Sequence, residues 1–292
     1  VLLWIRRHCQ AQIGPLRDLA TTLLDRAADH LDTVLPGYTH MQRAQPIRLA
    51  HHLLAYVWML ARDRTRLMAT VAATDECPLG SGALSGVGFP IDRAMVAAEL
   101  GFARPSANSL DAVASRDAMA DYLAFASQLG VHLSRLGAEL VFWSTEEFGF
   151  VELPDAFTSG SSMLPQKKNP DAAEMARAKA HRLAGDLSGL HGVVAGLPLT
   201  YNKDLQEDKH FLFDAADTLE LLLPAMTGMI AGATFRPERM RAACEGGAMA
   251  ATDLADHLVR LGWPFRRAHE AVGALVRAVI DRGVGLEAAT AH

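Results

Sequence analysis

Residues 109–143 read SLDAVASRDAMADYLAFASQLGVHLSRLGAELVFW, and this stretch decides the fold class. Its large apolar residues recur at steps of four and three: Leu129, Leu133, Leu136, Leu140 and Trp143. This spacing is typical of one face of an α-helix. At ~1.5 Å per residue, the helix would extend on the order of 50 Å. Helical patterns beyond ~25 residues indicate a bundle, a coiled coil or a helical repeat, and we find no internal period that supports a repeat.

Four further helices are predicted, and the first two show the same apolar spacing. We predict them at Val1–Leu31, from Pro46 to about Val71, at Pro170–Gly192 and at Asp208–Ala231. Within the 109–143 stretch, Phe125 and Phe142 add apolar surface on other faces. A helix that is apolar most of the way round must be buried by neighbours. The sequence therefore predicts an all-α protein built as a long-helix bundle that oligomerises.

Shorter helices follow the bundle. Chain-breaking glycines stand at Gly246–Gly247, Thr252 and Asp253 are placed to cap a helix that ends at Gly262, and Pro264 opens the next one. We therefore predict a central long-helix bundle domain at 1–244, which carries the catalytic loops. Residues 245–292 are predicted to be the start of a small helical C-terminal domain.

Composition excludes several classes of protein. Of 292 residues, 50% are apolar and 21% are charged, which is typical of a soluble globular chain. The net charge is -5, without a basic block for nucleic acid, and no apolar run approaches the ~20 residues of a membrane span. Cys9, Cys77 and Cys244 lack metal-ligand spacing and indicate reduced thiols in a cytoplasmic protein.

Loops are predicted at Leu35–Gln45, Cys77–Pro90 and Phe148–Pro170, and the last carries the most informative motif. Residues 160–171 read GSSMLPQKKNPD. One interpretation is structural, because Asn169 could cap a helix whose first residue is Pro170 and whose opening turns carry Asp171 and Glu174.

A functional interpretation of the same motif is equally supported. Gly160 stands seven residues before the adjacent pair Lys167 and Lys168, and its backbone freedom would let the loop move. A serine near lysines and a helix N-terminus lies in a positive field, which favours its alkoxide and would also hold a carboxylate.

Three other stretches are weaker signals. His40 lies in the polar segment Pro36–Pro46 and suits proton transfer near neutral pH, although a structural histidine is more common. Leu199–Lys209 combines charges with Tyr, Asn and Gln side chains that could orient a polar ligand, although such runs are usually solvated. Gly80–Gly88 could cradle an anion, but it follows no strand and is more often a turn. Hydrolase, zinc-protease and P-loop motifs are absent.

Together these motifs resemble the fumarase/aspartase superfamily, whose signature loop is Gly-Ser-Ser-x-x-Pro-x-Lys-x-Asn-Pro. Within that superfamily the chain is most similar to the argininosuccinate lyase family. The likeness runs through essentially the whole chain and rests on these segments: Gln166–Asp171, Pro36–Pro46, Thr200–Lys209, Phe89–Arg93, Asn108–Val113 and Ala251–Asp256.

The resemblance implies an activity and a set of site residues. It implies β-elimination of argininosuccinate to arginine and fumarate, with Ser161 as general base and Lys167 stabilising the aci-carboxylate that forms. His40 would pair with Glu174 and serve proton transfer. The implied substrate-binding residues are Thr39, Asn169, Tyr201, Gln206 and Lys209. No metal or organic cofactor is implied, and the implied assembly is a homotetramer in which three chains build each active site.

The chain departs from the family pattern in two respects. Met163–Leu164 reverses the family's Leu-Met order, a swap that conserves volume. The family's N-terminal domain, with a Ser-Arg-Asn-Asp segment that would lie just before Val1, is missing, and the C-terminal end looks short. We therefore expect the sequence to be a fragment of a longer protein.

Two alternatives remain at this stage. A sister lyase acting on adenylosuccinate or aspartate would need other substrate contacts than Tyr201–Lys209 and Lys167–Lys168 suggest. A crystallin-like structural relative is the non-enzymatic alternative. The presence of all the motif residues argues against an inactive relative but leaves a double role open.

Overall fold

The computed structural model describes residues 1–164, 167–245 and 248–286. The chain forms two compact units, and each is considered by itself. The first comprises residues 1–23, 56–142 and 153–232, and the second comprises residues 24–55, 143–152 and 233–292. The predicted domain boundary between residues 244 and 245 stays a prediction, and the predicted break at Gly246–Gly247 lies outside the described residues.

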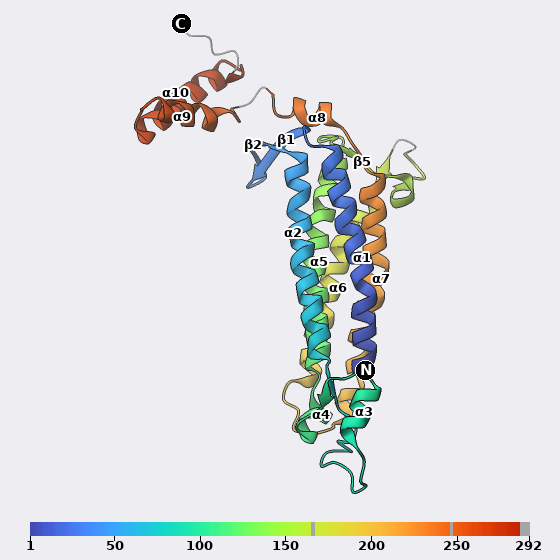
Figure 1. Ribbon diagram of the computed structural model, residues 1–292. Coiled ribbons are helices and arrows are strands. Elements are labelled where there is room, and N and C mark those ends of the chain that lie inside the picture. The colour runs from blue at the N-terminus through green and yellow to red at the C-terminus, as the bar shows by residue number, and fades with distance from the viewer. Residues whose placement is uncertain (165–166, 246–247, 287–292) are drawn as a thin grey trace. The chain divides into compact units, whose positions relative to one another are not determined.

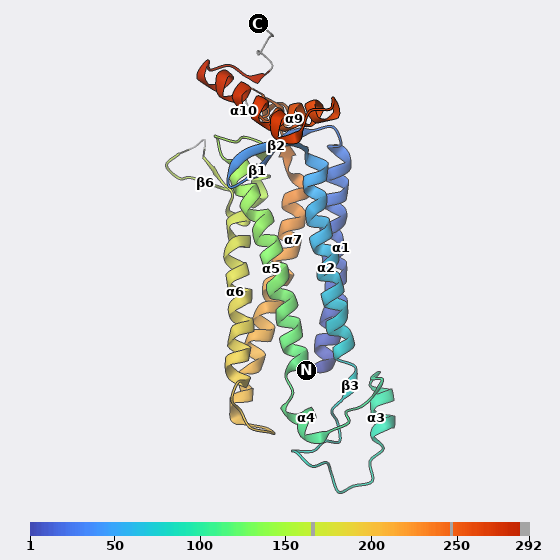
Figure 2. The same ribbon diagram turned by 90° about the vertical axis from the view of Figure 1, so that its left-hand side faces the viewer.

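Five long helices dominate the chain and confirm the predicted all-α class: α1 (Leu2–Asp29), α2 (Leu49–Ala73), α5 (Asp117–Ser144), α6 (Asp171–Val194) and α7 (Asp208–Gly232). In the first unit they lie alongside one another as a bundle (Figures 1 and 2). The predicted helix ends at residues 31, 192 and 231 differ from the observed ones by one or two residues, which is the usual uncertainty of helix ends.

Helix α5 is buried on several faces, as its sequence predicts. Its leucines 129, 133, 136 and 140 are almost fully buried, and so are Tyr122, Phe125 and Ala126. Glycine makes room for the neighbouring helix at one point. A Cβ at Gly137 would lie 2.7 Å from the carbonyl oxygen of Ala173 in α6. Because real Cβ atoms do not approach so closely, Gly137 allows α5 and the first turn of α6 to pack together.

The predicted single helix over 109–143 is wrong in one place. It is two helices, α4 (Ser109–Ala114) and α5, which are separated at Ser115 and Arg116. Ser115 has extended backbone (φ −60°, ψ 134°). One Arg116 guanidinium nitrogen donates to the carbonyls of Val113, Ala114 and Ser115 at 3.1, 3.4 and 2.8 Å. The side chain thus satisfies carbonyl groups that a continuing helix would have used.

The predicted loop Leu35–Gln45 is wrong, because these residues form a hairpin of β1 (Val34–Thr39) and β2 (Gln42–Arg48). The strands are antiparallel, with Pro36 opposite Pro46. Helix α2 consequently begins at Leu49, and the prediction that Pro46 opens it is also wrong. The two turn residues, His40 and Met41, have φ of 51° and 59°, as in a type I′ turn.

The remaining elements are short. They are β3 (Glu76–Cys77), α3 (Arg93–Glu99), β4 (Arg104–Pro105), β5 (Val151–Glu152), the 3-10 helix η1 (Asp155–Phe157), β6 (Ser159–Gly160), β7 (Lys168–Asn169), the 3-10 helix η2 (Lys203–Gln206), β8 (Thr234–Phe235) and α8 (Pro237–Ala242). In the described residues the strands pair in twos: β1–β2, β3–β4, β5–β8 and β6–β7. These strands are few and short, which agrees with the predicted all-α class. The segment between β3 and α3 confirms the predicted Cys77–Pro90 loop.

Two amphipathic helices, α9 (Ala251–Arg260) and α10 (Phe265–Asp281), lie near the end of the chain. Pro264 directly precedes α10, as predicted. The predicted cap at Thr252 and Asp253 is wrong, because both residues lie inside α9. The residue before that helix is Ala250, which makes no side-chain capping bond.

Candidate functional site

A small hairpin brings Ser161 and Lys167 to the same place. Strand β6 pairs antiparallel with β7, with Ser159 opposite Asn169 and Gly160 opposite Lys168. The next residue on each side is Ser161 and Lys167, so both residues stand where the loop leaves the strand pair. Pro165 and Gln166 of the signature loop lie outside the described residues. The two residues with the most demanding predicted roles are therefore neighbours in one chain.

The hydroxyl of Ser161 is held by backbone donors. The N–H groups of Met163 and Leu164 donate to Ser161 Oγ at 3.2 and 3.1 Å. The side chain is half-buried. Hydrogen bonds donated to an oxygen stabilise negative charge on it, so this turn favours the alkoxide that a general base at Ser161 requires.

The two adjacent lysines differ in their surroundings. Lys168 Nζ pairs with Asp155 Oδ1 at 2.6 Å across the surface of the first unit. Lys167 is exposed, and its backbone N–H donates to the Leu164 carbonyl at 3.0 Å. The ion pair ties Lys168 to η1, whereas Lys167 stands beside Ser161.

Asn169 and Glu174 occupy the start of α6. The prediction that Asn169 caps this helix is wrong: the position before the helix is Pro170, without a side-chain capping bond. Asn169 Nδ2 instead donates to Ser159 Oγ at 3.3 Å and braces the hairpin. Glu174 is exposed and accepts a bond from Arg177 at 3.4 Å.

His40 and Thr39 lie at the tip of the β1–β2 hairpin, and both are exposed. They belong to the second unit, whereas Ser161 and Glu174 belong to the first. The predicted pairing of His40 with Glu174 therefore stays a prediction. The left-handed conformation of His40 and Met41 fixes the direction in which the turn presents its side chains.

The other predicted binding residues follow the far end of α6. Tyr201 is 52% exposed, Gln206 is exposed in η2, and Lys209 lies in the first turn of α7. Helix α6 has 24 residues and is therefore ~36 Å long. Figure 2 shows it with β6 at one end and the connection to α7 at the other. We call the group of Ser161, Lys167, Asn169 and Glu174 the serine end of α6. The group of Tyr201, Gln206 and Lys209 is the lysine end. The two groups lie too far apart to form one site within a single chain.

A cavity of about 720 Å³ opens at the lysine end. This volume is within the usual range for a small-molecule site. Its lining includes Leu79, Phe102, Ser106, Arg116, Asp208 and Lys209. Asp208 has no exposed side-chain surface and contacts both Arg116 and Lys209. No sequence motif indicates this cluster, because Arg116 and Asp208 are 92 positions apart.

The glycine-rich loop lies against the same region. Gly80, Gly82 and Gly86 all have positive φ, and a Cβ at Gly82 would lie 2.4 Å from the carbonyl oxygen of Gly86. Thr200 Oγ1 donates to the Ala83 carbonyl at 3.4 Å. The loop is thus a tight turn that contacts the segment carrying Tyr201, and its role as an anion cradle stays untested.

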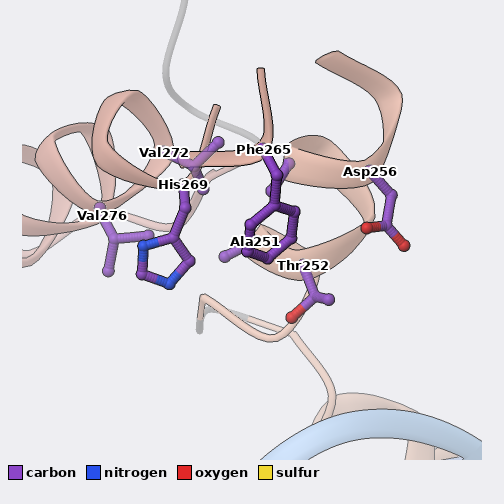
Figure 3. A pocket seen from close by; sticks show the side chains of 9 residues that line it. Ala251, Thr252, Asp256, Phe265, His269, Val272 and Val276 are labelled. Carbon is purple, nitrogen blue, oxygen red and sulfur yellow. The ribbon is translucent and has the colours of Figure 1, made fainter. Parts of the chain in front are cut away.

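A second, smaller cavity of about 240 Å³ lies between α9 and α10. Figure 3 shows Thr252 and Asp256 from α9, with Phe265 and His269 from α10. Its other lining residues are apolar or glycine: Ala251, Ala255, Val272, Gly273 and Val276. None of the predicted site residues lines it.

The described part of the chain contains neither a metal-binding cluster nor a membrane-spanning helix. Residues 1–164, 167–245 and 248–286 contain no group of three or more His, Cys, Asp or Glu residues placed to hold a metal ion. Over the same ranges, no helix is both long enough and apolar enough to cross a membrane.

The sequence profile of a family described as “Lyase” matches residues 1–185. This chain belongs to the lyase family. A second profile, described as “Argininosuccinate lyase C-terminal”, matches residues 248–292. The motif resemblance on which the predicted site rests is thereby confirmed at the level of the family.

The similarity to argininosuccinate lyases extends over nearly the whole chain. An argininosuccinate lyase from Moorella thermoacetica is 54% identical over 281 residues, which is 96% of this chain and 61% of that protein. One from Symbiobacterium thermophilum is 53% identical, over 97% of this chain and 61% of that protein. The chain therefore spans about three fifths of the length of these curated relatives.

Solved lyase structures share the fold. A variant of EDDS lyase with bound fumarate superposes with a TM-score of 0.90 at 33% identity, over 97% of this chain and 56% of that one. A class II fumarase from Schistosoma mansoni superposes with a TM-score of 0.82 at 18% identity, over 94% of this chain and 60% of that one. The second likeness concerns the fold alone.

Proposed function

We propose that the protein containing this chain cleaves argininosuccinate to arginine and fumarate by β-elimination. The main support is the 54% identity to an argininosuccinate lyase over almost the whole chain. The hairpin that brings Ser161 beside Lys167 adds a physical argument. An eliminating enzyme needs a base and a stabiliser of developing negative charge close together.

Ser161 is proposed as the general base. It removes a proton from the carbon beside a substrate carboxylate, and the electron pair left behind makes that carboxylate doubly charged. The Lys167 ammonium stabilises this charge as it forms. The electron pair then forms the double bond of fumarate while the C–N bond to the guanidinium group breaks. The two backbone bonds to Ser161 Oγ support the alkoxide form at the start.

The other predicted residues are proposed to bind substrate and assist the departing group. His40, paired with Glu174, would serve proton transfer to the guanidinium group. Substrate carboxylates and polar groups would be held by Thr39, Asn169, Tyr201, Gln206 and Lys209. The reaction moves a proton and breaks one bond without a change of redox state, so the proposal includes no cofactor.

Sharing of sites between chains is part of the proposal. The serine end and the lysine end are ~36 Å apart along α6. Argininosuccinate is too small a molecule to contact both ends of one chain. A homotetramer in which different chains supply the two ends would complete each site. A cytoplasmic location is also proposed, and the free thiols of Cys9, Cys77 and Cys244 favour it.

The experiment is to add argininosuccinate to the full-length protein and to follow fumarate by its ultraviolet absorbance. We expect fumarate and arginine in equal amounts. Adenylosuccinate and aspartate, supplied separately, test a sister lyase. Fumarate from one of these and none from argininosuccinate would contradict the proposal, and no product from any of the three would favour a structural relative.

A further inference from the structure

The carboxylate of Asp208 is the most deeply buried charge at the lysine end. It opens α7 and has no exposed side-chain surface. Its two oxygens have different partners: Arg116 Nε contacts Oδ2, and Lys209 Nζ contacts Oδ1. A buried carboxylate is costly unless it is paired and hydrogen-bonded. Asp208 therefore ties two cations to each other through one fixed group.

Arg116 is itself fixed from the opposite side. Its guanidinium donates to the carbonyls of Val113, Ala114 and Ser115 at the end of α4, and its side chain is only 15% exposed. These bonds leave little freedom for the Nε that contacts Asp208. The restraint runs from the end of α4, through Arg116 and Asp208, to Lys209.

Lys209 is the exposed end of this series. Its Nζ contacts Asp208 and donates to the Leu205 carbonyl at 3.2 Å. An ammonium group has three N–H donors, so these two partners, the ones found among the described residues, leave a third donor. The side chain is 42% exposed and lines the 720 Å³ cavity. The two protein bonds determine where this third donor points.

We propose that Arg116 is a positioning residue which, by holding Asp208, orients the Lys209 ammonium toward a substrate carboxylate in the cavity. The inference rests on the proposed function for the identity of the substrate. It goes further by adding Arg116 and Asp208, neither of which is among the predicted site residues. An oriented donor binds a carboxylate without first losing the freedom of a long lysine side chain.

The test uses the full-length protein and begins with Arg116→Met. We expect KM for argininosuccinate to rise about tenfold to a hundredfold, which is the range for losing an oriented charged hydrogen bond. We expect kcat to fall much less, because the base and Lys167 belong to the serine end. Arg116→Lys keeps a cation and should recover part of the loss in KM.

A double variant separates positioning from stability. Arg116→Met with Asp208→Leu removes one positive and one negative charge, so no buried charge is left unpaired. Replacing a whole buried ion pair by apolar side chains is often tolerated. We expect the thermal midpoint to return toward that of the wild type while KM stays high. Recovery of both quantities would overturn the inference, because a merely structural pair predicts that outcome.

The matched control is Arg182→Met. Arg182 also binds an aspartate, Asp214, and joins α6 to α7, but it does not line the cavity. We expect its KM to stay within about twofold of the wild type, since it orients no substrate donor. An equal rise of KM in this control would overturn the inference.

Binding of fumarate by titration calorimetry keeps the inference testable apart from turnover. If the wild type binds fumarate but does not cleave argininosuccinate, the proposed function fails. The weaker binding expected for Arg116→Met then still tests the positioning role. An Arg116→Met affinity equal to that of the wild type, or a wild type that binds no fumarate, would overturn the inference.

Discussion

The two ends of α6 hold their candidate residues in opposite ways. At the serine end, Ser161 rests on two backbone N–H groups in an exposed turn. At the lysine end, Lys209 rests on a carboxylate with no exposed surface, and that carboxylate is fixed by Arg116. One end depends on local backbone geometry, and the other depends on a buried ion cluster between distant segments.

This difference matches the two tasks proposed for these residues. A base must gain and lose a proton and reach its substrate, and the described residues beside Ser161, Ser162–Leu164, are exposed to solvent. A binding cation must stay in place, and burial of its partner prevents movement. Substitutions at the serine end should therefore change kcat without changing stability. Substitutions at the lysine end should change KM, and those that leave Asp208 unpaired should also lower stability.

The largest effect is expected for Ser161→Ala in the full-length enzyme. Removing the hydroxyl removes the proposed base, and general-base catalysis contributes roughly 10²–10⁴-fold. We expect kcat to fall by about 10³ or more, with the thermal midpoint and the oligomer unchanged, since the lost bonds lie in an exposed turn. Steady-state kinetics and size-exclusion chromatography check both parts. Activity above about a tenth of wild type would remove Ser161 from the role of base.

The next largest effect is expected for Lys167→Met. Loss of one preorganised charge-stabilising donor typically costs roughly 10²–10³-fold in kcat, and we expect a value in that range. The neighbouring Lys168→Met is the matched control, because it removes the same charge one residue away. Its surface ion pair with Asp155 is worth only ~0–1 kcal/mol. We therefore expect kcat of Lys168→Met to fall by less than about threefold. Similar losses in both variants would mean that the loop needs positive charge in general rather than Lys167.

The sequence predicts those parts of the fold that depend on local spacing. Apolar steps of four and three predict the end of α5 to within one residue, because every such helix must bury one stripe. They do not reveal the break that makes α4 a separate helix. The hairpin at Val34–Arg48 is missed for a physical reason. Its facing prolines, Pro36 and Pro46, donate no backbone hydrogen bond, and its turn is His-Met rather than the Asn-Gly that favours type I′.

The candidate site is likewise predictable only where its residues lie close together in the sequence. The motif at Gly160–Pro170 places Ser161 and Lys167 six residues apart, and the observed hairpin brings them together. Arg116 and Asp208 carry no local signal. The break at Ser115–Arg116 contains neither glycine nor proline, and Arg116 finds its partner 92 residues later. Contacts between distant segments need the packed bundle before they can be recognised.

The smallest effect is expected at a second buried carboxylate, Asp186, which forms no salt bridge in the described part of the chain, whereas Asp208 pairs with two cations. It is 8% exposed, and its Oδ2 has no partner in the described part of the chain. Burial, together with the charge and hydrogen bond of Asp214, raises the pKa of Asp186 from 3.8 to about 6. The hydrogen bond from Arg182 lowers the pKa of Asp214. In the folded chain Asp186 therefore releases its proton near pH 6, because its pKa is raised from 3.8 to about 6.

The sign of the pH dependence follows from the raised pKa. The folded chain binds the Asp186 proton more tightly than the unfolded chain does, so this contribution to stability is complete below about pH 4. It is lost as the pH rises to about 6 and stays lost above that. A shift of about two pKa units sets a ceiling of ~3 kcal/mol on the free energy involved. Because the cluster borders solvent, we expect about 1–2 kcal/mol.

Asp186→Asn tests this directly. The amide keeps the shape and can still donate to Asp214, but it carries no charge to desolvate. We expect the variant to match the wild type near pH 4 and to exceed its thermal midpoint by about 2–4 °C at pH 7.5, as measured by circular dichroism melts across that range. Asp18→Asn, at an exposed carboxylate on α1, should show no such trend. A difference between Asp186→Asn and wild type that shrinks as the pH rises would mean that Asp186 is stabilised as a carboxylate. The contrast between a paired and an unpaired buried carboxylate on neighbouring helices would then be wrong.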